Sequence, residues 1–511
     1  MKKPAAVIMI QGTASNVGKS ILTTALCRIF KQDGYSVAPF KSQNMALNAY
    51  VTPEGGQIGL AQALQAEACG ILPTVDMNPI LLKPEKDRSS ELVVQGKSRG
   101  SVEAGTYSKM TKDLLATVME SLNRLRSEFE IVVIEGAGSP AEINLNQHEI
   151  ANMRIAREAK SPVILVGSIE KGGVYAFLYG TVKILDKSDR ARIKGFVVNK
   201  LRGEPHRLQP ANEILKRKTG IPVLGVLPYY QDIKIAEEDN ATLSDLPQNL
   251  NSGDLDIAVV RFPYLSNYDD FDTFTTLNGN LRYVNNLSEL GQPHIIVLPN
   301  TNSIFYDLKW LRETGLAQAI TQQNLKGTII IGICGGYEIM GLDICDNNSV
   351  QKSPEENGLN VVQAGLAILP IHTVHTKDSC IRQVNATLKN PSGILLGITA
   401  EDLKGFESHN GHSTTENEGL FQINIAGEAQ ADGAINSAGN AFGTNIHHIF
   451  HNVSFTSALF DNIREYHNIS QSNKQLQINR DEEYEKLATL VRKYLNIDKI
   501  YCILGLANPN R

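Results

Sequence analysis

The chain has 511 residues, of which 42% are hydrophobic and 20% charged, and its formal net charge is −5. This length predicts two or three folding units, of which we expect two. No apolar run approaches the ~18 residues of a membrane span, and the net charge gives no general attraction to nucleic acid. We therefore expect small-molecule partners and no membrane or nucleic-acid partner. Six cysteines without a C-x-x-C pair fit a reducing cytoplasm.

The first half of the chain alternates short Val/Ile-rich runs with helix-like segments, which predicts a parallel sheet wrapped by helices. The runs are AAVIMI, SVAPF, IVVIEGAG, PVILVGS and IKGFVVN. Residues 237–254 are polar and turn-rich, and we place a domain boundary there. The expected domains are residues 1–240 and 253–460, both α/β. A tail over residues 461–511 should carry an amphipathic helix, because apolar residues recur at helical spacing over 481–496.

A glycine-rich loop follows the first apolar run and precedes a helix-like segment, which is the setting of a phosphate-binding P-loop. Its residues, 12–20, read GTASNVGKS. Backbone N–H groups would cradle the phosphates, Lys19 would reach the terminal phosphates, and the Ser20 hydroxyl would help to hold Mg²⁺. We therefore expect ATP and Mg²⁺ as cofactors; a glycine turn with a chance lysine is the weaker alternative. The expected nucleotide ligands are Gly12, Thr13, Gly18, Lys19 and Ser20.

The loop departs from the usual spacing, since Thr13 stands where the standard pattern has its first glycine. In this it resembles the dethiobiotin synthetase-like branch of P-loop proteins, whose members phosphorylate carboxylates or carbamates. Ala14 stands where the related partitioning ATPases carry an extra lysine, which argues against a motor. Glu135 ends an apolar strand and is the expected carboxylate ligand of Mg²⁺; its alternative is a strand-end glutamate in water. The resemblance implies that Asn199 recognises adenine.

Cys334 stands directly after a hydrophobic strand and before two glycines, in the segment GTIIIGICGGYEIMG. This is the layout of a nucleophile elbow, where a sharp turn exposes the sulfur and the N–H of Gly335 helps to stabilise an oxyanion. An isolated buried cysteine is more often a small core residue, but the elbow context favours a nucleophile.

A base for this thiol is offered by His447 or His448, in GTNIHHIFHN. The segment resembles the pattern of class I glutamine amidotransferases, which selects His447 and leaves His448 and His451 as surface or supporting residues. Many of these enzymes have a glutamate two residues after the histidine, whereas this chain has Ile449. The resemblance therefore implies a Cys-His dyad. It also implies a flavodoxin-like second domain.

A loop over residues 297–303, VLPNTNS, has Asn300 where the amidotransferases commonly have glycine after proline. Because asparagine adopts left-handed backbone geometry better than most residues, we expect this loop to keep its shape. Asn300 and Gly335 are then the expected oxyanion-hole residues.

Both halves together resemble the cobyric acid synthase and cobyrinic acid diamide synthase group. The segments closest to cobyric acid synthases are 40–45 (FKSQNM), 62–67, 76–84 and 405–409. The resemblance implies ATP- and glutamine-dependent amidation, through acyl phosphates, of carboxylates b, d, e and g of adenosylcobyrinic acid a,c-diamide. Lys41, Gln43 and Asn44 are the expected substrate-binding residues; without the resemblance they could be a polar loop after a strand.

Two alternatives remain open. One is a related amidotransferase acting on another acid, such as a cobyrinic acid a,c-diamide synthase or a cell-wall carboxylate amidase. The other is a non-enzymatic, nucleotide-dependent regulatory protein. The sequence leaves the oligomeric state undecided.

Overall fold

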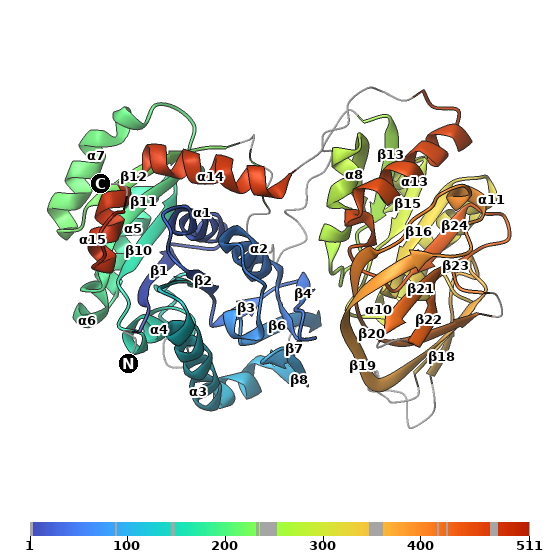
Figure 1. Cartoon of the computed structure of the whole chain (residues 1–511), viewed down its shortest axis with the longest axis horizontal. Helices are drawn as coiled ribbons and strands as arrows, with labels where there is room; N and C mark the ends of the chain where they lie inside the picture. The colour runs from blue at the N-terminus through green and yellow to red at the C-terminus, as the bar shows by residue number, and fades with distance from the viewer. Residues whose placement is uncertain are drawn as a thin grey trace. The chain divides into compact units, whose positions relative to one another are not determined.

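The computed structural model describes residues 4–86, 89–144, 149–230, 233, 235, 253–346, 361–415, 418–425, 428–470 and 479–509. The chain forms two compact units (Figure 1). The first takes in Met1–Lys83, Arg88–Asn240 and Ile478–Arg511, and the second takes in Pro84–Asp87 and Ala241–Gln477. Within the described ranges, no helix is long and apolar enough to cross a membrane.

A six-stranded parallel sheet forms the centre of the first unit, in the order β12-β11-β10-β1-β9-β2. Its strands are β1 (Ala6–Gly12), β2 (Val37–Phe40), β9 (Ile131–Glu135), β10 (Val163–Ser168), β11 (Ile193–Leu201) and β12 (Val223–Pro228). The chain winds from β1 to one edge and, after β9, to the other, so the winding direction reverses between β1 and β9. Parallel sheets bind ligands beyond the carboxyl ends of the strands at such a point.

Alternating residues of β1 face two different cores. Ile8 and Ile10 pack with α1 (Lys19–Gln32), whereas Val7 and Met9 pack with the helices on the other face. Those helices are α3 (Ala104–Glu128), α4 (Met153–Glu158), α5 (Val174–Ile184) and α7 (Gln209–Thr219). The predicted parallel sheet between layers of helices is thus confirmed.

The first unit also contains smaller elements. They are a four-stranded sheet of β3 (Gln43–Met45), β6 (Ile80–Lys86), β7 (Ser89–Val94) and β8 (Lys97–Glu103), the pair β4 (Ala49–Val51) and β5 (Gln57–Gly59), and the helices α2 (Leu60–Cys69) and α6 (Lys187–Arg190).

The end of the chain is divided between the units, which differs from the expected separate tail over 461–511. Residue 461 lies inside α13 (Val453–Tyr466) of the second unit. In contrast, α14 (Arg480–Tyr494) and α15 (Ile497–Leu504) bury their apolar residues against α1 in the first unit (Figure 1, red beside blue). Arg28 of α1 also donates to Glu485 at 2.7 Å. The amphipathic face of α14 is what attaches this segment to the first unit.

The second unit has a sheet in the order β14-β13-β15-β16-β24-β23, parallel except for the β23–β24 pair. Its strands are β13 (Leu255–Val260), β14 (Gly279–Val284), β15 (Ile295–Leu298), β16 (Ile329–Ile333), β23 (Ala434–Ile435) and β24 (Ala441–Thr444). Helices α8 (Asp272–Thr276), α9 (Leu287–Leu290), α10 (Ile304–Glu313), α11 (Leu316–Leu325) and α12 (Gly335–Ile339) accompany this sheet. A second, mixed sheet contains β17 (Asp343–Asp346), β18 (Val361–Ala364), β19 (Ile371–Leu388), β20 (Leu403–Thr415), β21 (Phe421–Ile425) and β22 (Glu428–Asp432).

Candidate active sites

The glycine-rich loop connects the end of β1 to the start of α1. Gly18 has a φ of 97°, in the left-handed region, and directly precedes Lys19 at the start of the helix. A Cβ at Gly12 would lie 2.7 Å from Val17 Cγ2 and 2.8 Å from the Ala14 carbonyl oxygen, so the fold of the loop requires glycine there. Lys19 Nζ donates to the Ala14 carbonyl at 3.1 Å. The loop and helix terminus therefore have the arrangement expected of a phosphate cradle.

Glu135 ends β9 beside this loop, and its side chain is fully buried. Its Oε1 accepts hydrogen bonds from Ser20 Oγ at 2.9 Å and from Lys41 Nζ at 2.8 Å. Its Oε2 accepts a hydrogen bond from Gln65 Nε2 at 2.6 Å. A hydroxyl and a carboxylate in contact supply the hard oxygen donors that Mg²⁺ prefers. The two expected metal ligands thus lie side by side and fit that ion.

Asn199 and Thr13 both tie the loop to neighbouring strands. Asn199 Nδ2 donates to the Val17 carbonyl at 2.9 Å, and Asn199 Oδ1 accepts from the Lys200 N–H at 2.8 Å. The Thr13 N–H donates to the carbonyl of Val166 at 2.9 Å. Both ends of the Asn199 amide are therefore used within the protein, and its contact with adenine stays a prediction.

The expected substrate-binding residues follow β2, and their side chains are held by neighbours. Lys41 Nζ is bonded to Glu135, as described above. Gln43 Oε1 accepts from the Tyr107 hydroxyl at 2.6 Å, and Asn44 Nδ2 donates to Gln62 Oε1 at 3.1 Å. Gln62 and Gln65, on α2, are thus brought into the same site. The sequence marked their segment without giving either glutamine a role, although their helical spacing places them on one face.

Cys334 stands in the turn between β16 and α12. Its φ of 49° and ψ of −113° are strained for a residue with a side chain, as expected for a nucleophile elbow. A Cβ at Gly336 would lie 1.9 Å from the Leu298 carbonyl oxygen, so the turn can pack against β15 only with glycine there. Cys334 Sγ lies 3.8 Å from the carbonyl oxygen of Ser408 on β20.

His447 lies just beyond β24, the parallel neighbour of β16, so Cys334 and His447 emerge at the same edge of the sheet. The Cys334 N–H donates to the Thr444 carbonyl at 2.9 Å. His447 is fully buried, and its Nε2 has no hydrogen-bond partner among the described residues. Cys334 and His447 therefore come from the same edge of the sheet, and the Nε2 atom of His447 is not used by the described part of the protein.

Asp270 supplies the carboxylate that the local sequence around His447 does not contain. Its Oδ2 lies 2.8 Å from His447 Nδ1, and its Oδ1 accepts from the His448 N–H at 2.7 Å. Asp270 is 1% exposed and belongs to a short 3-10 helix, Tyr268–Phe271. Ile449 led us to predict a Cys-His dyad without a local third member, and the structure adds a carboxylate to His447 from a distant segment. The chain separation of 177 residues hid this contact from local pattern analysis.

His448 and His451 contact the preceding aspartate, Asp269. His448 Nε2 lies 2.7 Å from Asp269 Oδ2, and His451 Nε2 lies 2.9 Å from the Asp269 carbonyl oxygen. Burial alone would raise the pKa of Asp269, but the charge and hydrogen bond of His448 hold that pKa below its usual value. These contacts assemble the segment that carries Asp270.

Asn300 does not use the left-handed backbone geometry that its residue type permits. Its side chain shapes the loop instead, since Nδ2 donates to Ser266 Oγ at 3.1 Å and Oδ1 accepts the Gly335 N–H at 3.1 Å. The nearby Thr301 hydroxyl donates to Asp307, whose pKa burial raises to about 7. The loop over residues 297–303 is therefore connected to the elbow by the side-chain amide of Asn300 and not by a left-handed backbone.

Strand β20 lies beside the turn that carries Cys334. Phe406 and His447 exchange backbone hydrogen bonds of 3.2 and 2.8 Å, and their rings stack at 4.9 Å. On either side of Ser408, Glu407 and His409 form a polar group with Arg382: Glu407 Oε2 accepts from Arg382 Nε at 2.5 Å, and Glu407 Oε1 lies 3.4 Å from His409 Nε2. Burial would lower the pKa of His409, but hydrogen bonds to Cys380 and Glu407 raise it to about 10.

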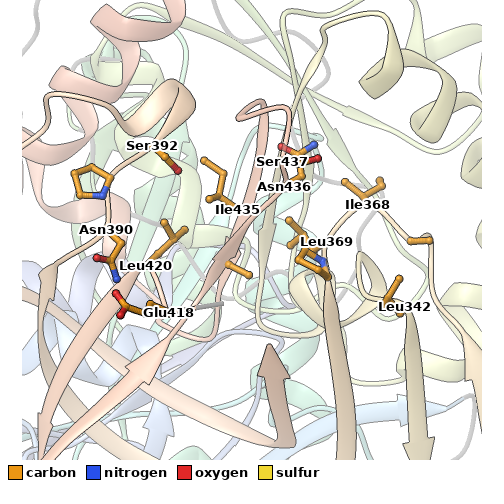
Figure 2. Close-up of a pocket in the computed structure, with 14 residues that line it drawn as sticks. Leu342, Ile368, Leu369, Asn390, Ser392, Glu418, Leu420, Ile435, Asn436 and Ser437 are labelled. Carbon is orange, nitrogen blue, oxygen red and sulfur yellow. The ribbon is translucent and has the colours of Figure 1, made fainter. Parts of the chain in front are cut away.

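A pocket of about 790 Å³ elsewhere in the second unit contains none of the expected site residues (Figure 2). Its apolar lining includes Leu342, Ile368 and Leu369, and Asn390 and Glu418 add polar groups. The described chemistry-bearing residues therefore gather around the elbow and the P-loop rather than around this pocket.

Comparisons with known proteins cover both units. Residues 8–243 match the family described as the CobQ/CobB/MinD/ParA nucleotide binding domain, and residues 256–455 match the CobB/CobQ-like glutamine amidotransferase domain. These matches confirm the predicted succession of folds.

Two curated relatives extend the likeness to nearly the whole chain. A cobyric acid synthase of Dehalococcoides mccartyi is 47% identical over 505 residues, which is 98% of this chain and 99% of the relative. A cobyric acid synthase of Desulfitobacterium hafniense is 42% identical over 522 residues, covering 99% of each.

Proposed function

This chain belongs to the cobyric acid synthase family, whose members are glutamine-dependent amidating ligases of cobalamin biosynthesis, and we propose how its two sites divide the reaction. Glutamine and a corrin acid are its substrates. The specific corrin acid is adenosylcobyrinic acid a,c-diamide, amidated at carboxylates b, d, e and g with ATP and Mg²⁺. The main support for the glutaminase role is the strained Cys334 turn at the same sheet edge as His447. The other unit has a P-loop in which Ser20 is hydrogen-bonded to Glu135, and this supports the ATP-dependent role.

Ammonia release begins at Cys334. His447 Nε2 takes the thiol proton, and the thiolate attacks the side-chain amide carbon of glutamine. The C–N bond then breaks, the imidazolium returns its proton to the leaving ammonia, and water hydrolyses the remaining thioester to glutamate. Asp270 acts as a positioning residue, because its bond to Nδ1 keeps a proton there and leaves the Nε2 lone pair free to act as base.

The oxyanion formed in this step is stabilised by the Gly335 N–H. This N–H donates to Asn300 Oδ1 at 3.1 Å. Substrate binding therefore has to displace Asn300 Oδ1 from the N–H. Asn300 thus supports the oxyanion hole through its side chain, which holds the Gly335 N–H until the oxyanion replaces it.

Carboxylate activation takes place at the P-loop. Ser20 and Glu135 would hold Mg²⁺, which would supply positive charge to neutralise the phosphates of ATP. Lys19 would contact the terminal phosphates. Lys41, which pairs with Glu135, is assigned the role of orienting the acceptor carboxylate toward the γ-phosphate. Phosphorylation converts a poor oxide leaving group into phosphate.

Mass spectrometry of reactions with candidate acids tests this function. The protein is incubated with ATP, Mg²⁺, glutamine and the a,c-diamide, and in parallel with cobyrinic acid or a cell-wall carboxylate. We expect successive replacement of carboxyl by amide groups on the a,c-diamide. Amidation of another acid in its place would overturn the substrate assignment, and ATP binding without amidation of any acid would favour the regulatory alternative.

A further inference from the structure

Two glutamines of α2 face the candidate synthetase site from one side. Gln62 and Gln65 are three residues apart, which puts them on the same face of the helix. Both are 0% exposed. We call Gln62 and Gln65 the glutamine pair.

The two side-chain amides of the glutamine pair are held by opposite ends: Gln65 by its NH₂ group and Gln62 by its oxygen. Gln65 donates through Nε2 to Glu135 Oε2 at 2.6 Å, and an ionised carboxylate can only accept. Its carbonyl oxygen is therefore turned away from Glu135. Gln62 accepts through Oε1 from Asn44 Nδ2 at 3.1 Å, which leaves its amide nitrogen at the other end.

Those remaining polar atoms are buried without a partner. Across the described part of the chain, neither Gln62 Nε2 nor Gln65 Oε1 has a hydrogen bond. The Ser42 hydroxyl, next to Lys41, is in the same state. Buried polar atoms in folded proteins are nearly always paired, so a group of unpaired atoms beside a P-loop indicates that a bound molecule completes them.

The glutamine pair presents one donor and one acceptor. A carboxylate has two acceptor oxygens, so the Gln65 oxygen would repel one of them. An acyl group under attack by ammonia has an oxygen that accepts and a nitrogen that donates, and so does the amide product. The pair is therefore complementary to the species formed during amidation rather than to the starting acid.

We propose that the glutamine pair holds the reacting acyl group, with Gln62 Nε2 donating to the acyl oxygen and Gln65 Oε1 accepting from the attacking ammonia. This rests on the proposed function. The ammonia lone pair forms the C–N bond, and the carbon–oxygen bond to phosphate breaks with its electrons leaving on phosphate. One nitrogen proton passes to the departing phosphate. Because Gln65 also contacts Glu135, the amide nitrogen forms next to the activation site.

The test uses ammonium chloride as nitrogen source for the full-length enzyme, with ATP, Mg²⁺ and the a,c-diamide, so that glutamine hydrolysis is bypassed. Gln62→Met and Gln65→Met remove the proposed bonds to the reacting acyl group at nearly constant volume, together with the existing bonds to Asn44 and Glu135. We expect amide formation to fall roughly 100-fold, at the lower end of losses for a hydrogen bond made to a reacting group. Acyl phosphate should still form and be hydrolysed, so phosphate released should exceed amide formed.

The matched control is Gln209→Met, an exposed glutamine at the start of α7, which should keep the wild-type ratio of phosphate to amide. Gln62→Glu keeps the size of the side chain and turns the donor into an acceptor, so it should be at least as damaging as Gln62→Met. It also provides the readout if a methionine variant does not fold.

Two results would overturn the role of the pair. One is an unchanged ratio with a raised requirement for Mg²⁺ or ATP, which would assign both glutamines to the nucleotide site. The other is wild-type amidation by all variants. A wild-type enzyme that amidates no acid from either nitrogen source would instead overturn the proposed function together with the pair.

Discussion

Replacing Asp270 with asparagine should switch the tautomer of His447 with little change in shape. Asp270 Oδ1 accepts the His448 N–H, and an asparagine oxygen can continue to do so. The new NH₂ group then faces His447 Nδ1, which has to become an acceptor. The ring proton moves to Nε2, where it blocks acceptance of the Cys334 proton.

The magnitude follows from the charge-assisted bond between Asp270 and His447, which the asparagine replaces with a neutral bond of the opposite direction. A bond to a charged group contributes about 1.5–3 kcal/mol, and about 1.4 kcal/mol corresponds to a factor of ten. We therefore expect glutamine hydrolysis to slow by roughly 10- to 150-fold in Asp270→Asn. Amidation driven by ammonium chloride should be unchanged, because Asp270 acts only in ammonia release.

The assay measures glutamate release and ammonium-driven amidation on the same preparation. Asp269→Asn is the matched control, since Asp269 is the adjacent buried aspartate and bonds His448 rather than His447. It should slow glutamate release much less than Asp270→Asn does. Equal rates of glutamate release by wild type and Asp270→Asn would refute the positioning role. Equal losses of rate in Asp270→Asn and Asp269→Asn would show that both aspartates act only by maintaining the structure.

Three further predictions address the separate parts of the chain. Cys334→Ser should abolish glutamine-driven amidation and keep ammonium-driven amidation; retained glutamine hydrolysis would show that another group is the nucleophile. Lys19→Met should reduce amidation from both nitrogen sources at least 100-fold, roughly the effect of losing one preorganised charge contact in a transition state. Thioester formation at Cys334 should continue in this variant. Normal ATP turnover would exclude Lys19 from the phosphate site. Asp307→Asn should stabilise the second unit at pH 8 and not at pH 4, as measured by denaturant unfolding. Burial raises the Asp307 pKa to about 7, so its stability contribution is fully present below the unfolded pKa and is lost as pH rises through 7. The difference should be on the order of a few kcal/mol, and equal effects at both pH values would contradict it.

Much of the fold could be predicted because hydrophobic pattern and glycine spacing are local properties. The Val/Ile runs indicated parallel strands, and the GTASNVGKS and GICGG segments indicated where two strands turn into helices. At Gly12 and Gly336 the reason is steric, since a Cβ would collide with neighbouring backbone in each turn. Such requirements are visible in the sequence as glycines at fixed distances from Lys19 and Cys334.

The backbone of Asn300 could not be inferred in the same way. Asparagine tolerates left-handed geometry, but its amide can also bond to atoms distant in sequence. The structure shows the second outcome, with Ser266 and Gly335 as partners. Intrinsic preference alone does not reveal which of two such options the surrounding fold supplies.

The sequence by itself determined the types of reactive group and the turns that expose them, because a P-loop lysine and an elbow cysteine need particular neighbours in the chain. Only the tertiary structure decided which side chains support them. Asp270 reaches His447 because parallel strands bring distant segments to one edge of a sheet, and Gln65 reaches Glu135 because helix α2 packs beside β2. Such hydrogen bonds depend on distance and direction in space, and neither leaves a periodic trace along the chain.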